Sequence, residues 1–408
     1  MNRKYFSAIC MMLLLILTTG AAKQTAESVK NVFPAVSLRL SSPLTADDCL
    51  HIQDSFKKGF PDISRFAVWT QKQSIITNNS GDRGANTQVI LFSGGEEIVW
   101  PQKFLNLGSP DSVQGRGCSV STQLAYELFG STRVIGLPFK FEDNIYSVQG
   151  VFEFSDSLLM IPVSLENDFL FENLELLISP GKDGNAVAQA FLRENGLDAD
   201  AVLNGPELGA VLCMISSLPI FFVWFSVFIS LFWKTLKKQI QIQYKLEAAV
   251  FLLLYLFLFF GLNTKIPASL IPTKWSDFSY WSRTAFLYKG RLIELLSLNV
   301  TAKDLFFRIQ CLILLLFIIL GMAVAGAYGI SLAVWSNQFT IRDAFFLHTA
   351  WTVIMCFAIR WFPMNPRFLY CLCFPYFSFS VLNRNKNKIK ILHLEVNQKN
   401  GAIPKKIF

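Results

Sequence analysis

Long apolar segments without charged residues constrain this chain more than any other feature. The clearest runs from Gly209 to Trp233, "GAVLCMISSLPIFFVWFSVFISLFW", and contains no Asp, Glu, Lys or Arg. A helix needs about 20 apolar residues to cross the hydrocarbon core of a bilayer. Because 52% of the 408 residues are hydrophobic and only 16% are charged, the composition excludes an ordinary soluble domain. The chain is therefore predicted to be a polytopic membrane protein.

The hydropathy pattern predicts six membrane-spanning helices. They are Ala8–Ala22, Gly209–Trp233, Ala248–Leu262, Cys311–Trp335, Ala344–Ala358 and Phe368–Leu382. The first follows two basic residues and ends in small residues, so it is either an uncleaved anchor or a secretory signal peptide. The sixth is short and contains Pro375, which leaves open a hairpin lying partly in the membrane interface.

The charges are divided unevenly along the chain. Residues 23–206 contain 14 Lys and Arg against 22 Asp and Glu, whereas the rest contains 23 against 7. Because cytoplasmic loops are enriched in Lys and Arg, residues 23–206 are predicted to lie outside the membrane and both termini inside. Membrane orientation accounts for the net charge of +8, which removes the main argument for a nucleic-acid partner, and none is expected. The predicted divisions are an anchor or signal at 1–22, the external domain at 23–206, membrane helices at 207–382 with an external loop at 263–307, and a basic tail at 383–408.

Residues 23–206 carry the pattern of an α+β domain. "AVSLRLS" alternates like a half-buried strand, and "RFAVWTQ", "TQVILFS" and "ENLELLISPG" are further strand candidates. "LTADDCLHIQDSFKKG" begins a helix with a capping box of Thr45 and Asp48. A second helix is expected over Thr122–Phe129, closed by Gly130, and "AVAQAFLRENG" predicts a third. "LPFKFEDNIYSVQGVFE" predicts a hairpin that turns at Asp143 and Asn144.

The stretch "CSVSTQLAYELFGSTRVIGLPFKFEDNIYSVQGVFEFSD" resembles the end of the MacB-like periplasmic core domain of ABC transporter permeases, the MacB/FtsX-like superfamily. The resemblance covers roughly Val36 to Val163. That family places the domain between its first two transmembrane helices, which is the layout predicted here. The membrane half diverges, because the family usually has three helices after the domain and this chain has more predicted spans.

The resemblance implies a bacterial cell-membrane permease of the mechanotransmission type. A separate ATPase subunit would hydrolyse ATP, and its motion would be relayed to the external domain to export or extract a lipid, peptide or similar substrate. The sequence contains no G-x-x-x-x-G-K-[ST] loop, so the ATPase is expected on a partner chain. By position alone, the loop with Lys234, Lys237, Lys238 and Lys245 is the candidate ATPase contact, and a basic cluster that only fixes topology is the alternative.

Two further groups of residues are candidate contact surfaces. Gly321, Ala325 and Gly329 recur every four residues and give one smooth helix face, for packing within the chain or for pairing with a second copy or a second permease subunit. The external loop carries aromatic and charged residues that serve either as interfacial anchors among membrane lipids or as substrate contacts: Lys274, Trp275, Asp277, Tyr280, Trp281 and Arg283.

The sequence shows few features that indicate an enzyme. With three histidines, the chain has no H-E-x-x-H motif, no paired His and Cys spacing for zinc and no G-x-S-x-G elbow, so neither a cofactor nor a metal is expected. Cys49 and Cys118 are the two cysteines predicted outside the membrane, and they could form a disulfide. The alternative function is a membrane-embedded sensor or enzyme that acts at the outer surface through the loop containing Asp277 and Arg283.

Overall fold

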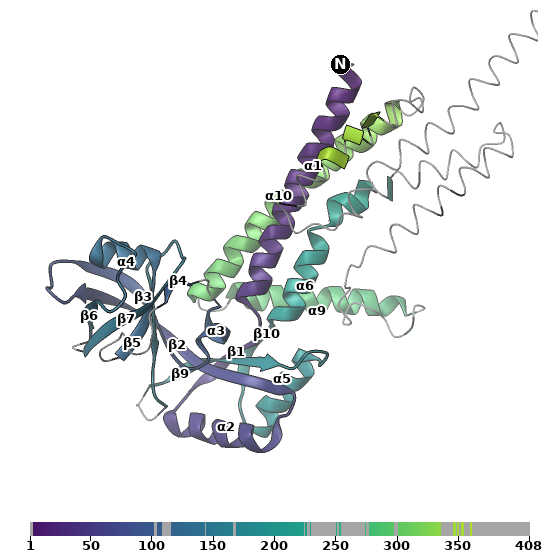
Figure 1. The fold of residues 1–408 in the computed structure, drawn as a ribbon. Helices are drawn as coiled ribbons and strands as arrows, with labels where there is room; N and C mark the ends of the chain where they lie inside the picture. The colour runs from purple at the N-terminus through teal and green to yellow at the C-terminus, as the bar shows by residue number, and fades with distance from the viewer. Residues whose placement is uncertain are drawn as a thin grey trace, which may run out of the picture. The chain divides into compact units, whose positions relative to one another are not determined.

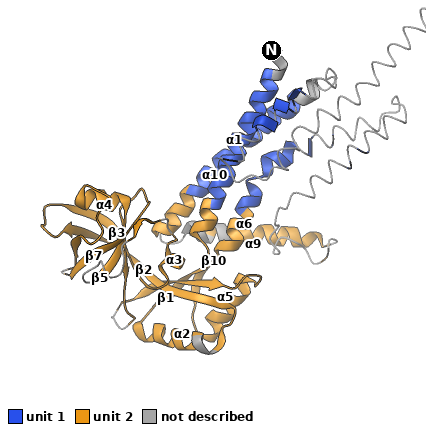
Figure 2. Ribbon diagram, in the orientation of Figure 1, with its two compact units in different colours: residues 1–27, 212–266, 310–408 blue, residues 28–211, 267–309 orange. Residues whose placement is uncertain are grey.

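The structure, a computed structural model, describes residues 3–101, 104–107, 116–142, 144–165, 169–223, 277–297 and 301–335, with isolated residues between 225 and 360. It divides into two compact units (Figure 2). Unit 1 comprises residues 1–27, 212–266 and 310–408, and unit 2 comprises residues 28–211 and 267–309. Each unit is described by itself below.

The secondary structure of the described residues includes ten strands (Figure 1). The strands are β1 (Val36–Leu44), β2 (Ile63–Asn78), β3 (Gly84–Gly94), β4 (Phe104–Leu107), β5 (Arg116–Ser121), β6 (Pro138–Phe141), β7 (Asn144–Phe152), β8 (Leu158–Pro162), β9 (Phe171–Ile178) and β10 (Ala199–Asn204). The helices are α1 (Arg3–Val32), α2 (Ala46–Gly59), α3 (Glu96–Val99), α4 (Thr122–Phe129), α5 (Gly184–Glu194), α6 (Gly205–Ile215), α9 (Phe278–Ser297) and α10 (Ala302–Trp335).

In unit 2 all ten strands form one mixed sheet in the order β10-β1-β9-β2-β3-β8-β5-β7-β4, with β6 paired to β2 and β7. Most neighbours are antiparallel, but β3 pairs with β8 and β5 with β7 in parallel. The predicted strands and helices of residues 36–194 are all present, and the predicted hairpin is β6 and β7. Asn144 begins β7 rather than standing in the turn. Strands β8 and β10, the short edge strand β4 and the short helix α3 were not predicted.

Helix boundaries follow their capping residues. Thr45 caps α2 with the predicted box, because its side chain accepts from the Asp48 amide while the Asp48 carboxylate accepts from the Thr45 amide. Ser121 caps α4 by accepting from the Leu124 amide. Gly130 ends α4 at φ 73°, a left-handed conformation that favours glycine.

One face of the sheet is apolar and covered by α2, α4 and α5. Leu38 and Leu174 of the sheet share a buried cluster with Phe191 of α5, and Val120 and Leu159 share another with Leu124 of α4. In Figure 1, α2 and α5 lie side by side beneath β1 and β9. This face is the main core of unit 2.

The second face is also buried, although part of it is polar. Trp69, Phe92 and Met160 pack there against α3 and against Ala302, the first residue of α10. Along β1 and β9, however, the residues that point to this face are Ser37, Arg39, Asn173 and Glu175, and all four are buried. The start of α10 therefore covers a polar patch on the sheet.

Three helices among the described residues are long and apolar enough to cross a membrane: Phe6–Val32, Gly205–Val223 and Ala302–Ser331. They contain or overlap the first, second and fourth predicted spans. The first extends to Val32, well beyond the predicted limit of Ala22, and the last begins inside the predicted external loop. The third, fifth and sixth predicted spans, and the basic tail, lie largely or wholly outside the described residues.

In unit 1, segments of these same three helices pack on one another. Ala22, Ala26, Leu314 and Ile318 form a buried cluster, with Leu212, Ile215 and neighbouring apolar residues packed against it. Ala325 is fully buried, and a Cβ added at Gly321 would lie 2.8 Å from the Pro219 ring. The face of Gly321 and Ala325 is thus in contact with a segment of its own chain.

Candidate functional site

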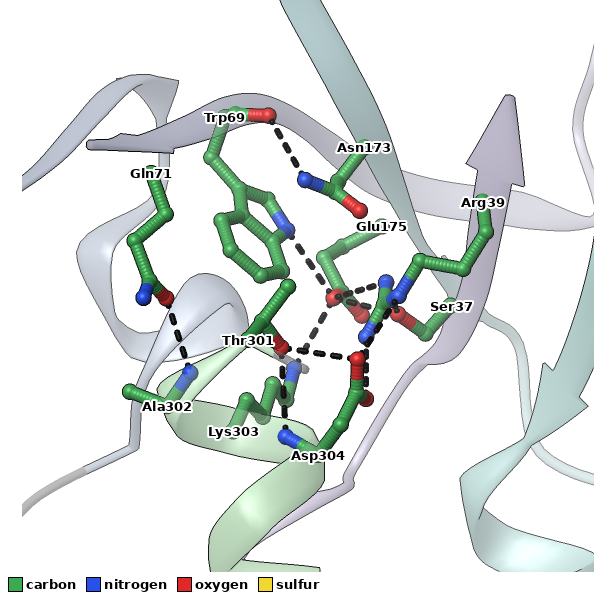
Figure 3. Close-up of polar contacts among 10 residues, drawn as sticks. All are labelled: Ser37, Arg39, Trp69, Gln71, Asn173, Glu175, Thr301, Ala302, Lys303 and Asp304. Atoms are coloured by element: carbon green, nitrogen blue, oxygen red, sulfur yellow. Dashed lines mark hydrogen bonds and ion pairs between the residues drawn. The ribbon is translucent and has the colours of Figure 1, made fainter. Parts of the chain in front are cut away.

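Four buried charged side chains join the start of α10 to the polar patch of the sheet in unit 2 (Figure 3). Arg39 of β1 and Glu175 of β9 come from the sheet, and Lys303 and Asp304 come from the first turn of α10. We call these four residues the junction network. The side chains of Glu175 and Lys303 are 0% exposed, that of Asp304 2% and that of Arg39 7%. Two cations and two anions are present, so the buried charge sums to zero.

Strand register explains how the sheet contributes its half. Side chains alternate between the faces of a strand, so Leu38 and Leu174 enter the core while Arg39 and Glu175 face α10. Ser37 lies opposite Glu175, and Arg39 lies opposite Asn173, which in turn lies opposite Trp69 of β2. These two cross-strand rows build the polar patch.

Glu175 is the centre of the network. Its Oε1 accepts hydrogen bonds from Lys303 Nζ at 2.9 Å, Ser37 Oγ at 2.6 Å and Trp69 Nε1 at 3.1 Å. Arg39 Nη1 lies 3.9 Å from the same oxygen. A buried carboxylate is costly unless it is paired and hydrogen-bonded, and these donors meet that need at Oε1. Glu175 Oε2 is buried and has no hydrogen-bond partner among the described residues.

Arg39 makes the second ion pair, with Asp304. Its Nη2 donates to Asp304 Oδ1 at 2.8 Å and its Nε to Oδ2 at 3.4 Å, which is the paired geometry that guanidinium and carboxylate favour. Burial alone would lower the pKa of Arg39, but the carboxylates of Asp304 and Glu175 outweigh it and raise that pKa. The guanidinium also lies 5.2 Å from the centre of the Trp69 ring.

The first turn of α10 is built for this contact. Thr301 precedes the helix, and its Oγ1 accepts from the Asp304 amide and donates to Asp304 Oδ2. The backbone amide of Ala302 donates to Gln71 Oε1 of β2 at 2.8 Å. This hydrogen bond satisfies one of the N–H groups at the start of a helix that have no partner within the helix. Asp304 also places a negative charge near the positive end of the helix dipole.

The ends of α1 and α6 that belong to unit 2 meet α10 at the same place. Phe33, just after α1, contacts Phe307 of α10 edge to face at 5.5 Å, and Lys303 Nζ lies 4.9 Å from the centre of the Phe33 ring. A Cβ added at Gly205 would lie 2.2 Å from the Phe33 carbonyl oxygen, and one added at Gly209 would lie 2.7 Å from Lys30 Cβ. The two glycines, four residues apart in α6, let α6 approach α1 closely.

The arrangement suits a mechanical joint rather than a reaction centre. Its ionisable groups are sealed from solvent, and the cavity between the three helix ends, lined by Phe33, Gly205 and Asp304, measures about 10 Å³, the size of one water molecule. Within the described residues no group of three His, Cys, Asp or Glu side chains could hold a metal ion.

The sequence-predicted site residues lie elsewhere or have structural roles. Lys234, Lys237, Lys238, Lys245 and Trp275 lie outside the described residues. Lys274 and Trp281 are exposed. Asp277 precedes α9, where it accepts from the Tyr280 amide and pairs with Arg283 at 2.9 Å. The hydroxyl of Ser279 holds the pKa of Asp277 below its ordinary value.

The structure does not pair Cys49 with Cys118, because both are free thiols. Cys49 is buried in the cluster under α2 and α5, and Cys118 in the separate cluster under α4. Burial raises the pKa of Cys49 to about 11 and raises the pKa of Cys118 as well. The predicted disulfide would require two hydrophobic clusters to merge.

Reasoning from the sequence missed the junction network. Arg39 lay on the polar side of a strand predicted to be half-buried, Glu175 lay in a strand candidate with no assigned role, and Lys303 and Asp304 fell within a predicted loop. Two signals were available: the T-x-x-D spacing of Thr301 and Asp304, which is typical of a helix start just before an apolar segment, and the G-x-x-x-G spacing of Gly205 and Gly209.

Comparisons with known proteins found similarity at the level of structure. The chain is similar to the extracellular domain of the noncanonic ABC-type transporter YknZ from Gram-positive bacteria, with 13% identity and a TM-score of 0.32 over 40% of this chain and 95% of that one. It is similar to the periplasmic region of MacB from Actinobacillus actinomycetemcomitans, with 13% identity and a TM-score of 0.36 over 45% and 94%.

A third similar structure is a domain of a protein named as a permease from Porphyromonas gingivalis, with 14% identity and a TM-score of 0.30 over 41% and 84%. No family model and no curated protein sequence matches the chain. The role of individual residues has to be inferred from this chain's own contacts.

Proposed function

We propose that this chain is the permease subunit of an ABC transporter of the mechanotransmission type. In this proposal a separate subunit hydrolyses ATP in the cytoplasm, and the membrane helices relay its motion to the sheet domain of unit 2. The domain then exports or extracts a lipid, peptide or similar substrate. The observation that carries the proposal is the junction network, because it fixes the first turn of an apolar, membrane-length helix to the sheet.

A relay needs a connection that does not slip, and the network supplies one. Apolar packing is non-directional, so on its own it would let α10 rotate or shift against the sheet. Each buried charge instead has one oppositely charged partner at hydrogen-bond distance: Lys303 meets Glu175, and Asp304 meets Arg39. Leaving one of them unpaired costs about 3–5 kcal/mol. Displacement of α10 would therefore carry β1 and β9 with it.

Covalent continuity and the glycine contacts support the same mechanism for the other two helices. α1 leads into β1, and β10 leads directly into α6. The contacts of Gly205 and Gly209 with Phe33 and Lys30 hold α1 and α6 together where they meet the sheet. All three apolar helices would then move the sheet domain together.

The remaining parts of the proposal follow the sequence. The chain would lie in the bacterial cytoplasmic membrane with six crossings, the sheet domain outside and the basic tail inside. The loop of Lys234, Lys237, Lys238 and Lys245 would contact the ATPase, and a second copy or a second permease subunit would complete the transporter. The alternative is an outer-surface sensor or enzyme that would act through Asp277 and Arg283, which pair with each other at 2.9 Å at the start of α9.

Affinity purification of the full-length chain from its own host, in mild detergent, tests the proposal. We expect a subunit with an ATP-binding P-loop to co-purify with the wild type, with Lys303→Met and with Lys182→Met. The last is a matched control, because Lys182 pairs with Asp62 at 2.9 Å on the exposed surface of the same unit. After reconstitution, ATP hydrolysis should change in Lys303→Met and stay unchanged in Lys182→Met.

Two results would contradict the proposal. If no ATP-binding subunit accompanies the wild-type chain, the transporter assignment is wrong. If ATP hydrolysis is the same in Lys303→Met as in the wild type, although the variant loosens the first turn of α10, the relay does not pass through the junction network.

A further inference from the structure

Helix α9 exposes a row of large apolar side chains that nothing in unit 2 covers among the described residues. Phe278 is 83% exposed, Phe286 77%, Ile293 55% and Trp281 45%. Successive helix residues are rotated by about 100°, so residues 278, 281, 286 and 293 fall on one side of α9. Ala285 and Lys289 lie on the same side. We call this side the α9 stripe. Exposed rows of this kind mark a surface that meets a partner or a membrane.

A hydrogen-bond hub fixes the middle of α9 to the rest of unit 2. Tyr288 Oη donates to Glu207 Oε1 at 2.7 Å, and the other oxygen, Glu207 Oε2, accepts from Asn185 of α5 at 2.7 Å and from Asn204 of β10 at 3.2 Å. Glu207 thus joins α9 to α5, β10 and the first turn of α6. Hydrogen bonds to a charged acceptor are stronger than those between neutral groups.

This hub places α9 at the level where the apolar helices begin. Glu207 is the third residue of the membrane-length segment Gly205–Val223, and it bonds the centre of α9. At its other end, α9 finishes at Ser297, only a short connection before α10 begins at Ala302. The apolar segments of α6 and α10 therefore both begin beside α9. If these two helices cross the membrane, α9 lies at the level of the bilayer surface.

The charge of α9 suits the same position. The helix carries Arg283, Lys289 and Arg291 against one acidic residue, Glu294. A helix with an apolar side and basic residues lies in the membrane interface, where it buries the apolar side and attracts anionic lipids. Lys289, on the stripe itself, can extend its long side chain outward to the phosphate level.

We propose that α9 is an interfacial helix that binds the outer leaflet of the same membrane through anionic phospholipids. The stripe inserts among the acyl chains, the basic residues contact the phosphate groups, and the hub of Glu207 transmits this anchoring to α6 and the sheet. The proposal requires that α6 and α10 cross the membrane. It does not depend on the ATPase partner, so it can fail or succeed separately from the proposed function.

Photo-crosslinking of the full-length chain tests the proposal. A benzoylphenylalanine is placed at Phe286 in the stripe, at Leu287, or at Ile75 of β2, and the chain is reconstituted into vesicles of phosphatidylethanolamine with or without phosphatidylglycerol. Leu287 is 52% exposed but lies on the opposite side of α9, and Ile75, at 70%, is about as exposed as Phe286. Only variants that elute like the wild type in size exclusion are compared.

We expect phospholipid adducts at position 286 several-fold above those at 287 and 75, and more of them when phosphatidylglycerol is present. Benzoylphenylalanine at Phe278, the most exposed stripe residue, should repeat the result. Adducts to a second copy of the chain at position 286 would show that the stripe is a protein interface and would overturn the proposal. Equal lipid adducts at 286 and 75 would overturn it as well.

Discussion

Lys303→Met tests the junction network most directly, because it removes one buried charge and keeps a side chain of similar length. Glu175 would retain its hydrogen bonds from Ser37 and Trp69, but its only remaining cation among the described residues would be Arg39 Nη1 at 3.9 Å. That guanidinium is already engaged with Asp304 at 2.8 Å. The carboxylate would stay buried with too little compensation, and we expect a loss of about 3–5 kcal/mol.

Hydrogen exchange of the full-length chain measures this loss locally. The first turn of α10 carries the amides of Ala302, Asp304 and Leu305, which are bonded to Gln71 or Thr301. Since each 1.4 kcal/mol is tenfold in an equilibrium constant, a loss of about 3 kcal/mol should speed their exchange by roughly 100-fold. Lys182→Met, which breaks an exposed pair, should change exchange by less than about fivefold, because such pairs contribute about 0–1 kcal/mol.

The double variant Lys303→Met with Glu175→Gln completes the test. It removes both charges of the pair and keeps an acceptor for Ser37 and Trp69, so most of the protection should return. If Lys303→Met exchanges no faster than Lys182→Met, or if the double variant is worse than the sum of the two single ones, the argument from the buried pair is refuted.

Three further predictions follow from single contacts. Gly205→Ala should destabilise the chain by about 1–3 kcal/mol or more, because its Cβ would lie 2.2 Å from the Phe33 carbonyl oxygen; in thermal unfolding, Gly290→Ala, which has open space around it, should show no such loss. Tyr288→Phe should cost about 1.5–3 kcal/mol through its lost bond to Glu207, seen as faster exchange in α9; unchanged exchange would contradict the hub. Cys49 should react slowly with a maleimide at pH 8 and faster as the pH approaches its pKa of about 11. Because folding raises the pKa of this thiol above its ordinary value of about 8.5, burial of the neutral thiol contributes its full share of stability below that pH. This contribution is lost as the pH rises toward 11. Rapid labelling of Cys49 in the folded chain at pH 8 would disagree with its burial.

The apolar face of the sheet could be predicted from the sequence because its signals are local. Val36, Leu38 and Leu40 alternate along β1, and all three are buried in the same cluster. The capping box of α2 was read from Thr45 and Asp48, three positions apart, and the end of α4 was read from Gly130. Such patterns depend on backbone geometry within one element, so they can be recognised without knowledge of the fold.

The polar face could not be predicted, because its partners are distant in the chain. Arg39 and Asp304 are 265 residues apart, and Glu175 and Lys303 are 128 apart. A strand with one polar face is normally solvated on that face, and β1 fits this description until α10 covers it. Long-range contacts of this kind leave no periodic signal in either partner, and for this reason the junction network appeared only in the structure.

Prediction of the membrane half from the sequence is limited by a different cause. Hydropathy finds apolar helices well, and Phe6–Val32, Gly205–Val223 and Ala302–Ser331 meet its criteria. Hydropathy does not locate the start of a helix whose first turn is polar and buried, as the turn with Lys303 and Asp304 is. The predicted fourth span accordingly began at Cys311, and the residues that attach α10 to the sheet were left in the loop before it.

The buried charges of the junction network are better explained by specificity than by stability. Replacing a buried ion pair by neutral residues of similar size is often neutral for stability, so Lys303→Met with Glu175→Gln should regain protection in the first turn of α10. Its register against β9, however, would no longer be set by the Lys303–Glu175 pair. We therefore expect this double variant to keep its stability but not to regain wild-type ATP hydrolysis by the partner subunit. Recovery of both properties together would mean that the pair only stabilises the fold, and that the relay requires no fixed register.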